Sequence, residues 1–546
     1  MSDWARSAAA SLAAALLTGA ALAWNASAAT APSSPDTAGV DPTGLPVRQV
    51  VIEPHNMFDP VPPGRLGPVY RLANGLHVRT RARTVREQLL FAPGDRWDPE
   101  RGRETQRNLR GLGFLFPDEI VPRVENDSVT VVVRTRDAWT TAVEFNLETT
   151  GGERFGSVGL TERNLLGLGK SLSVSRRVEP SGVSRSVGFG DPAVFGSRMR
   201  FQFQAGTGSG GANNHVSLGL PFYAQDTPTS WNVEWFRSTS VMLLYAGPSQ
   251  VASLDERLEE TEVTWGKGHH QDGTITRGML SLLVRERRLG PSRADSLAPP
   301  DFTGGEENLH LRRFAAELML WHPHFIERRD VDRMTGVEDF DVGANSSIKL
   351  GVSPRGLGST ANEAYARLKL NLGAETPYGF GWAHGSLESR FRWTPIETVR
   401  RLDARWVTAP FAQQRLVLSL LGVSGERMAR DFQVSIGGLN GLRAYPVHEL
   451  TGTRAWRMVA ENRWIPPHTD TQMVALGAAV FCDAARAWGP GAAGTTWHTD
   501  AGFGLRLGTP RTSMREVVRF DVAYPISPLP GGKRSVVFSF GSSQAF

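Results

Sequence analysis

An arginine in a glycine-rich stretch is the side chain best placed for specific chemistry. Arg443 lies in the middle of the irregular sequence IGGLNGLRAYPVHEL, residues 436–450. Glu461 and Asp483 follow on the polar faces of later strand segments, and Phe481 lies one alternation before Asp483. A guanidinium presents a planar fork that suits carboxylates, so these residue types favour charge pairing rather than catalysis. Taken alone, the sequence favours the alternative, in which Arg443 is a solvated loop residue.

Familiar catalytic and metal-binding patterns are missing. The sequence contains no Gly-x-Ser-x-Gly, His-Glu-x-x-His or phosphate-loop string. The pairs His269 with His270 and His322 with His324 lack a third ligand at metal spacing. We therefore expect no enzymatic activity, no catalytic residue, no metal and no cofactor.

Composition excludes several classes of protein. The chain has 546 residues, of which 40% are hydrophobic and 21% charged, and it contains 58 Gly and one Cys, Cys482. These values exclude a collagen, a coiled coil, a disulfide-rich miniprotein and a wholly disordered chain. The formal net charge of +5 is small for this length and does not suggest a partner nucleic acid.

The N-terminal residues predict export. Arg6 precedes an apolar run over residues 8–23, and Ala26, Ser27 and Ala28 follow. This pattern is typical of a secretory signal peptide, residues 1–28, that is cleaved after Ala28. Residues 29–45 have the Pro, Ser and Thr composition of a linker. No later stretch is long and apolar enough for a membrane-spanning helix, so the exported chain is either soluble or held in a membrane by strands.

Residues 46–138 predict one small α+β domain. Thr84 and Glu87 have the spacing of a capping box that opens a helix over residues 84–91. Asp98 as N-cap and Pro99 at the first helical position predict a second helix that ends near residue 111 or 113. Strands are expected at residues 50–52, 119–125 and 128–135.

Residues 139–546 predict an all-β transmembrane barrel. About twenty short windows alternate between apolar and polar residues and are separated by Gly, Pro, Asp and Asn. Phe503 and Leu505 alternate with Arg506, and Phe520 alternates with Asp521. One apolar and one charged face suit a barrel with lipid outside and a polar interior, although a soluble barrel would reverse the two faces. Two polar intervals, residues 253–260 and 290–308, are expected to be extracellular loops.

The C-terminal segment is expected to be the last strand. Val536, Phe538, Phe540 and Phe546 share one alternating set, which suits a lipid-facing strand and a terminal assembly signal. The seam with the first strand, near residues 140–147, is expected to be the working surface. Gly541 is interpreted as an interruption of the apolar face that weakens or kinks the closure. Alternatively, Gly541 merely accommodates neighbouring side chains.

The region around Arg443 resembles a known family, the BamA/TamA-like outer-membrane assembly factors, also called bacterial surface antigens. In that family a loop after the eleventh of sixteen strands folds into the barrel and carries an Arg-Gly-Tyr or Arg-Gly-Phe motif. Arg443, Ala444 and Tyr445 occupy that place, and five strand windows follow. FCDAARAW, residues 481–488, resembles the Phe-x-Asp strand of the family, and AENRW, residues 460–464, resembles its partner strand. Residues 46–138 resemble a POTRA (polypeptide-transport-associated) domain.

The resemblance implies a specific architecture. A single periplasmic POTRA domain would precede a barrel of sixteen antiparallel strands, with up to about twenty possible, and a loop near residues 425–452 would fold into the lumen. Because a guanidinium inside a barrel needs partners, Arg443 would bond Asp483 and Glu461, with Phe481 against its flank. Ala444 replaces the usual Gly, and if the tip needs a positive φ there, Ala444 would be strained.

The resemblance also implies a function in the outer membrane of a Gram-negative bacterium. The protein would assist the insertion of β-barrel proteins or the translocation of polypeptides across that membrane. Its expected partners are outer-membrane lipids, unfolded client polypeptides and a periplasmic chaperone or lipoprotein that binds the POTRA domain. A passive channel or surface structural protein, and a secretion pore for one dedicated exoprotein, remain as alternatives.

Overall fold

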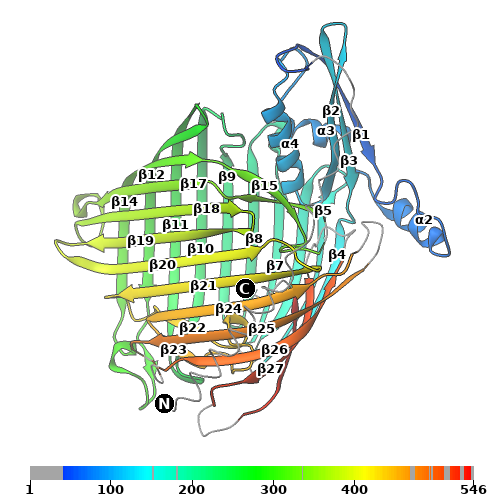
Figure 1. The fold of residues 1–546 in the computed structure, drawn as a ribbon. Coiled ribbons are helices and arrows are strands. Elements are labelled where there is room, and N and C mark those ends of the chain that lie inside the picture. The colour runs from blue at the N-terminus through cyan, green and yellow to red at the C-terminus, as the bar shows by residue number, and fades with distance from the viewer. Residues whose placement is uncertain are drawn as a thin grey trace.

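The computed structural model describes residues 41–150, 153–179, 182–334, 336–467, 474–490, 492, 496–509, 517–528 and 534–542. Within these ranges a small α/β domain is followed by a closed β-barrel, and the domain sits over one end of the barrel (Figure 1). We call that end the domain end and the opposite one the far end. The expected signal peptide and Phe546 lie outside the described residues. Among the described helices, none has both the length and the apolar character needed to span a membrane.

The α/β domain is a three-stranded sheet with two helices packed against it. The strand order is β1-β3-β2, with β1 parallel and β2 antiparallel to β3. Val85, Leu109, Leu115 and Val131 are fully buried and form the centre of its core. Its elements are β1 (Val47–His55), α2 (Gly67–Leu76), α3 (Ala82–Arg86), α4 (Pro99–Gly111), β2 (Leu115–Glu125) and β3 (Ser128–Asp137).

The structure confirms one of the two helix starts predicted for this domain. Asp98 caps α4 by accepting a hydrogen bond from the amide of Glu100, as its sequence predicts. The predicted capping box at Thr84 is wrong, because α3 begins two residues earlier and the Thr84 hydroxyl instead donates to the carbonyl of Gly167 in the barrel. The additional helix α2, between β1 and α3, was not predicted.

The barrel is a continuous antiparallel sheet that closes on itself. Fifteen strands precede the glycine-rich loop and five follow it, so the described residues form twenty strands, together with the two-residue β13 (Arg293–Ala294). Those before the loop are β4 (Thr141–Thr150), β5 (Glu153–Leu165), β6 (Lys170–Glu179), β7 (Gly182–Asp191), β8 (Arg200–Gly208), β9 (Gly211–Leu220), β10 (Thr229–Ala246), β11 (Ser249–Gln271), β12 (Thr274–Leu289), β14 (Glu307–His322), β17 (Ala344–Ser353), β18 (Glu363–Thr376), β19 (Gly379–Phe391), β20 (Pro395–Thr408) and β21 (Gln414–Glu426).

The strands after the loop are β24 (Arg454–Trp464), β25 (Ala475–Trp488), β26 (His498–Gly508), β27 (Val517–Pro525) and β28 (Val537–Ser542). The barrel thus has twenty strands, the upper end of the predicted range, in place of the expected sixteen, and the five strands after the loop agree with the prediction. The difference lies entirely before the loop. Each additional hairpin widens a barrel without changing the alternation of its other strands, so the pattern of one strand carries no information about the total.

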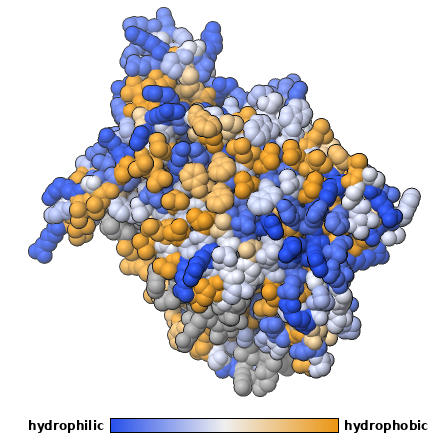
Figure 2. All heavy atoms as spheres, turned by 180° about the vertical axis from the view of Figure 1, so that it is seen from behind, coloured by the Kyte–Doolittle hydropathy of each residue, from blue (hydrophilic) through white to orange (hydrophobic). Residues whose placement is uncertain are grey.

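The two faces of the wall have the polarity that the alternation predicts. Phe503 and Leu505 are each 61% exposed, whereas Arg506, the next residue, is 1% exposed. Phe520 is likewise exposed and its neighbour Asp521 is buried. Apolar side chains therefore cover the outside, and charged side chains face an enclosed interior. Figure 2 shows the hydrophobic side chains as a band across the barrel wall next to the domain, with hydrophilic side chains gathered toward the far end.

One of the two predicted loops is strand. Residues 253–260 lie within β11, where Glu260 pairs with Arg285 and Glu256 with Arg287 on β12. The high charge density that suggested a loop is accommodated by these cross-strand pairs, because opposite charges on adjacent strands stabilise a sheet. Residues 290–306, by contrast, connect β12 to β14 and contain only β13 and a single turn of 3-10 helix, η2 (Pro300–Phe302).

Two segments leave the wall and reach into the barrel. The first is a hairpin at the domain end, between β14 and β17, which consists of β15 (Phe325–Arg329) and β16 (Val337–Asp341). The second is the glycine-rich loop between β21 and β24, which contains β22 (Val434–Ile436), η4 (Gly438–Asn440) and β23 (Leu450–Gly452). We call them the domain-end hairpin and the inward loop.

The barrel closes between β28 and β4. Within the described residues the register that joins these strands contains one pair, Phe540 with Thr149, whereas six pairs join β27 to β28. Phe538 lies on the outer face and is 67% exposed. Gly541 is paired with Arg519, whose side chain points inward and is buried, so the interpretation that Gly541 interrupts the outer apolar face is wrong. This position favours the alternative, in which Gly541 accommodates neighbouring side chains.

Candidate functional site in the barrel lumen

The inward loop owes its course to an unusual backbone at its start. Gly437 has a φ of 146°, and a Cβ atom at that position would overlap the carbonyl oxygen of Pro446. Only glycine fits such a close approach of two backbone segments. At the tip, the Tyr445 amide donates to the carbonyl of Leu442 at 3.1 Å, and Leu442 itself has a φ of 66°. These turns place residues 443–445 at the innermost point of the loop.

Arg443 is held by two carboxylates from adjacent strands of the wall. Its Nε and Nη2 donate to the two oxygens of Asp483 on β25, both at 2.8 Å, and its Nη1 donates to Glu461 on β24 at 2.7 Å. The guanidinium carbon lies 3.3 Å from the centre of the Phe481 ring. The structure thus brings together the four residues that the sequence singles out, and the guanidinium is 1% exposed.

The other two residues of the tip are anchored through different atoms. The Ala444 amide donates to Oδ2 of Asp500 on β26 at 2.9 Å. The Tyr445 hydroxyl lies 2.7 Å from the carbonyl oxygen of Ser527 and 3.0 Å from that of Thr499. Ala444 does not have a positive φ, so the strain expected there is absent, and Leu442 has the left-handed conformation instead. An alanine fits this tip because the left-handed residue is two positions earlier.

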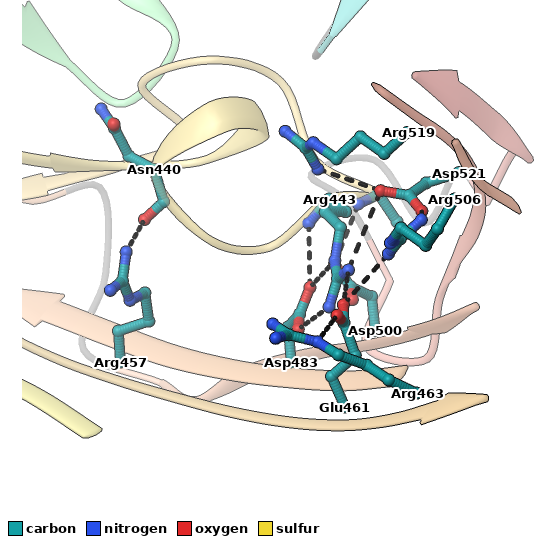
Figure 3. Close-up of polar contacts among 11 residues, drawn as sticks. Asn440, Arg443, Arg457, Glu461, Arg463, Asp483, Asp500, Arg506, Arg519 and Asp521 are labelled. Atoms are coloured by element: carbon teal, nitrogen blue, oxygen red, sulfur yellow. Dashed lines mark hydrogen bonds and ion pairs between the residues drawn. The ribbon is translucent and has the colours of Figure 1, made fainter. Parts of the chain in front are cut away.

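The Arg443 pair belongs to a larger set of buried charges. Arg506 bridges Glu461 at 3.2 Å and Asp521 at 2.6 Å, and Arg519 donates to Asp521 at 2.9 Å (Figure 3). Arg463 donates to the remaining oxygen of Glu461 at 2.7 Å. All members are at most 5% exposed. We call this set the lumen charge cluster: Arg443, Arg463, Arg506, Arg519, Glu461, Asp483, Asp500 and Asp521.

The lumen charge cluster sets four arginines beside four carboxyl groups, so its buried charges have partners of opposite sign. Moving a charge out of water is expensive, and a buried pair repays this cost only when its geometry is good. Arg443 and Asp483 satisfy that condition with two parallel hydrogen bonds. Such pairs add little net stability, but removing one member leaves an uncompensated charge. The cluster therefore fixes the position of the loop more than it stabilises the fold.

Five members of this cluster were not predicted as site residues, although the alternation places Arg506 and Asp521 on the charged face of their strands. Arg506, Arg519 and Asp521 stand on the same polar faces as the recognised residues, so strand alternation could have found them. Arg463 and Asp500 also follow that alternation, two residues from Glu461 and opposite Asp483 respectively. The alternation does not show which inward-facing residues of different strands lie at the same level along the barrel axis.

The inward loop is also attached to the opposite side of the barrel. The ring of His448 stacks on that of Tyr245, on β10, with centroids 3.8 Å apart. The Gln433 side chain accepts from the Tyr245 amide at 3.1 Å and donates to its carbonyl at 2.7 Å. The Gly247 amide donates to the Thr451 hydroxyl at 3.0 Å. The loop thus crosses the lumen from β10 to β24, β25 and β26.

The domain-end hairpin links the α/β domain to this cluster. Arg110 on α4 is buried and donates to Asp339 at 2.7 Å and to Glu327 at 2.6 Å, one on each strand of the hairpin. At the tip of the hairpin, the Val331 carbonyl accepts from Nη1 of Arg463 at 2.8 Å. Contacts therefore run without a gap from the domain, through the hairpin, to the inward loop.

The hairpin also contains a buried carboxyl group. The Glu338 side chain is 7% exposed and accepts from the amides of Val331 and Asp332, at 2.9 and 3.1 Å. Burial raises the pKa of Glu338 to about 7, and the nearby Asp332 acts in the same direction, although the two amides and Arg333 lower it. This group therefore titrates near neutral pH.

A cavity of about 870 Å³ lies between α4, the hairpin and the barrel wall. Arg107, Arg163, Arg200 and Arg277 line it together with aromatic side chains. Among the described residues no three His, Cys, Asp or Glu side chains are grouped as a metal would require. The arrangement as a whole can hold polypeptide segments and charges.

The terminal residues singled out by the sequence lie apart from this cluster. Phe538 and Phe540 are on the outer side of β28, and the ring of Phe540 lies 4.6 Å from that of Phe520 on β27. Gly541 is on the inner side. They belong to the seam, whereas Arg443, Ala444 and Tyr445 belong to the lumen.

Comparisons with known proteins give similarity in structure alone. No model of a protein family and no curated protein matches the sequence. BamA from Haemophilus ducreyi, in a form lacking POTRA domains 1–3, aligns over 91% of this chain and 84% of its own, with 14% identity and a TM-score of 0.41. CdiB from Acinetobacter baumannii aligns over 92% and 74%, with 11% identity and a TM-score of 0.45. CdiB from Escherichia coli aligns over 91% and 76%, with 12% identity and a TM-score of 0.43. These alignments span most of the chain at low sequence identity.

Proposed function

We propose that this protein resides in a bacterial outer membrane and assists the insertion of β-barrel proteins or the translocation of polypeptides. The domain end would face the periplasm and the far end the outside. No covalent chemistry is required. The protein would act by positioning an extended client chain next to strand edges, which can template an incoming strand.

The outer surface of the barrel supports the membrane location. Leu350, Leu370 and Leu476, on three different strands, are exposed and point away from the lumen. Exposed apolar side chains recur in this way along the strands. The continuous apolar area that they form is larger than the exposed apolar patches of water-soluble monomers. A closed barrel satisfies its backbone hydrogen bonds internally, which is the condition for strands to cross a bilayer.

One observation carries the proposed activity: the continuous contact from the α/β domain to the inward loop. Arg110 attaches the domain to the hairpin, and Arg463 attaches the hairpin to Glu461 and thereby to Arg443. A client that engages the domain can change the equilibrium position of the loop only if the two are in contact. This chain of bonds provides that contact.

The same contacts argue against a passive channel. The inward loop crosses the lumen from one side of the wall to the other. The domain-end hairpin lies between this loop and the α/β domain. A pore built for steady conduction would not be crossed by two segments, each fixed through buried arginines. The segments suit a barrel that opens only when a client displaces them.

Reconstitution tests the proposal. The full-length chain is placed in phospholipid vesicles, an unfolded β-barrel client is added, and its insertion is followed by protease protection together with ion conductance. We expect faster client insertion than in protein-free vesicles and no steady conductance. Arg443→Ala should slow client insertion while the protein still reaches the membrane.

Contrary results would be informative in different ways. Steady conductance with no effect on client insertion would favour the passive channel. Transport of a single exported polypeptide with no effect on barrel clients would favour the dedicated secretion pore. An unchanged rate for Arg443→Ala would remove the assignment of the inward loop to client handling.

A further inference from the structure

Helix α2 exposes a stripe of large apolar side chains that nothing else in the described structure covers. Leu66, Val69, Leu72 and Leu76 are between 50% and 66% exposed. Their spacings of three, three and four residues put them on one side of the helix. Val78, just beyond the helix, is 52% exposed and extends the stripe.

The opposite side of the same helix is firmly attached, so the exposure is not the result of a loose segment. Tyr70 is buried, and its ring lies 4.5 Å from that of Phe58. The Asn74 side chain accepts from the Phe58 amide at 3.1 Å and donates to its carbonyl at 2.8 Å. The orientation of the apolar stripe is therefore set by the fold.

These contacts place α2 next to the start of β4, the first barrel strand. His77 is the C-cap of the helix, and its Nε2 lies 2.8 Å from Oδ2 of Asp137, the last residue of β3. Trp139 packs against the cluster that contains Phe58 and Tyr70. The strand β4 begins two residues after Trp139. Val143 on that strand is 72% exposed on the outer wall. Figure 1 shows α2 outside the barrel beside β4, and Figure 2 shows hydrophobic side chains on the projecting α2 region and on the adjoining wall.

The charge around the helix has one sign. Residues 60–86 contain six arginines and no Asp or Glu. Arg65, Arg71 and Arg79 are exposed, and among the described residues none of them has an acidic partner. Apolar side chains next to unpaired arginines are typical of helices that lie in the headgroup region of a bilayer, where arginines meet phosphate.

We propose that α2 is an interfacial helix that lies in the inner-leaflet surface of the same membrane that holds the barrel. The proposal rests on the membrane location in the proposed function and extends it to the α/β domain. The helix has ten residues and is about 15 Å long, so it lies along the membrane rather than across it. Its apolar stripe continues the lipid-facing surface of the barrel beyond β4. The domain is thereby held at a fixed height and angle beside the seam between β28 and β4.

Site-directed spin labelling in vesicles tests this assignment. In a Cys482→Ala background, single cysteines are introduced by Leu72→Cys and Leu76→Cys on the stripe and by Arg71→Cys off it. Arg123→Cys on β2 reports the water-exposed part of the same domain, and Leu505→Cys reports the outer wall of the barrel. The full-length protein is placed in phosphatidylethanolamine and phosphatidylglycerol vesicles, and the accessibility of each label to oxygen and to a water-soluble nickel chelate is measured.

We expect the ratio of oxygen to nickel accessibility to be several-fold higher at positions 72, 76 and 505 than at positions 71 and 123. Equal ratios at positions 72, 76 and 123, with a high ratio at 505, would overturn the interfacial helix and leave the membrane location intact. The stripe would then be available for a protein partner. A low ratio at 505 would overturn the membrane location and the helix assignment with it. A high ratio at 71 as well as 72 would contradict the one-sided burial on which the assignment depends.

Discussion

Asp483 on β25 and Asp500 on β26 lie directly opposite each other, and the tip of the inward loop donates to both. The Arg443 guanidinium bonds Asp483, and the Ala444 amide bonds Asp500. Two carboxyl groups thus lie side by side in the wall, and the inward loop gives each of them a hydrogen-bond donor. Asp483 receives a charged guanidinium and Asp500 a neutral backbone amide, so the wall favours the inserted loop mainly through Asp483.

The two carboxylates should respond differently to the same substitution. Asp483→Asn removes one charge of a two-point pair with Arg443 and should lower the free energy of unfolding by about 3 kcal/mol. Asp500→Asn keeps an acceptor for the Ala444 amide, and the hydrogen bond that it preserves comes from a neutral group, so its effect should stay within about 1 kcal/mol. Denaturant unfolding of the micelle-bound barrel, followed by tryptophan fluorescence, measures both. Equal losses would show that the pair of Asp483 with Arg443 contributes no more than the neutral hydrogen bond of Asp500.

Arg443→Ala should destabilise the inserted loop by about 3–5 kcal/mol, because Asp483 stays buried and loses its arginine, while Glu461 keeps Arg463 and Arg506. Arg443→Lys retains the positive charge but not the planar fork of the guanidinium. Its loss of stability should therefore lie between zero and that of Arg443→Ala. The double variant Arg443→Ala with Asp483→Asn should lose less than the sum of the single changes, since the second change removes the unpaired charge. Strict additivity in the same unfolding experiment would contradict a direct pair.

Arg110→Ala should release the α/β domain from the domain-end hairpin. Arg110 is buried between Asp339 and Glu327, whereas Arg103 on the same helix is exposed and pairs with the exposed Glu100. Arg103→Ala is therefore the matched control, because exposed pairs contribute little. We expect faster hydrogen exchange in residues 325–341 and a rise in ion conductance for Arg110→Ala alone. If both variants behave alike, the domain does not hold the hairpin.

Stability should depend on pH through Glu338. Its pKa is raised to about 7 in the folded protein by burial, so between about pH 4.5 and about pH 7 the folded state retains a proton that the unfolded state has released. The free energy of unfolding should therefore fall as pH rises through this range, by up to roughly 3 kcal/mol. Glu338→Gln should remove that part of the dependence. Urea unfolding of both proteins at about pH 5 and about pH 8 measures the difference, and parallel changes in the two would exclude Glu338 as the cause.

Gly437→Ala should disturb the inward loop without affecting the barrel. The residue has a φ of 146°, and a methyl group there would overlap the Pro446 carbonyl, so a loss of at least about 2 kcal/mol is expected. Gly356→Ala is the control, because a Cβ at that position meets nothing within 4 Å. Protease sensitivity of residues 427–453 reports the loop. Resistance equal to that of the Gly356→Ala protein would mean that the loop tolerates a different backbone at its start.

The amino-acid sequence by itself determined the elements that depend on neighbouring residues. Asp98 and Pro99 begin α4, the alternation of Phe503, Leu505 and Arg506 assigns the two faces of the wall, and five strands follow the glycine-rich stretch. Each of these follows from a period or a cap within about ten residues, so each can be read without knowledge of the rest of the chain.

The tertiary structure alone decided how many strands close the barrel and which charges meet inside it. Closure at twenty strands depends on the stagger of the whole sheet, and the contact between Val331 and Arg463 joins residues 132 positions apart. The apolar stripe of α2 is likewise recognised only from the structure, which buries Tyr70, ties Asn74 to Phe58 and leaves Leu72 exposed. Sequence periods specify which way a side chain points, whereas the depth at which strands align is set by the registers of all the strands together.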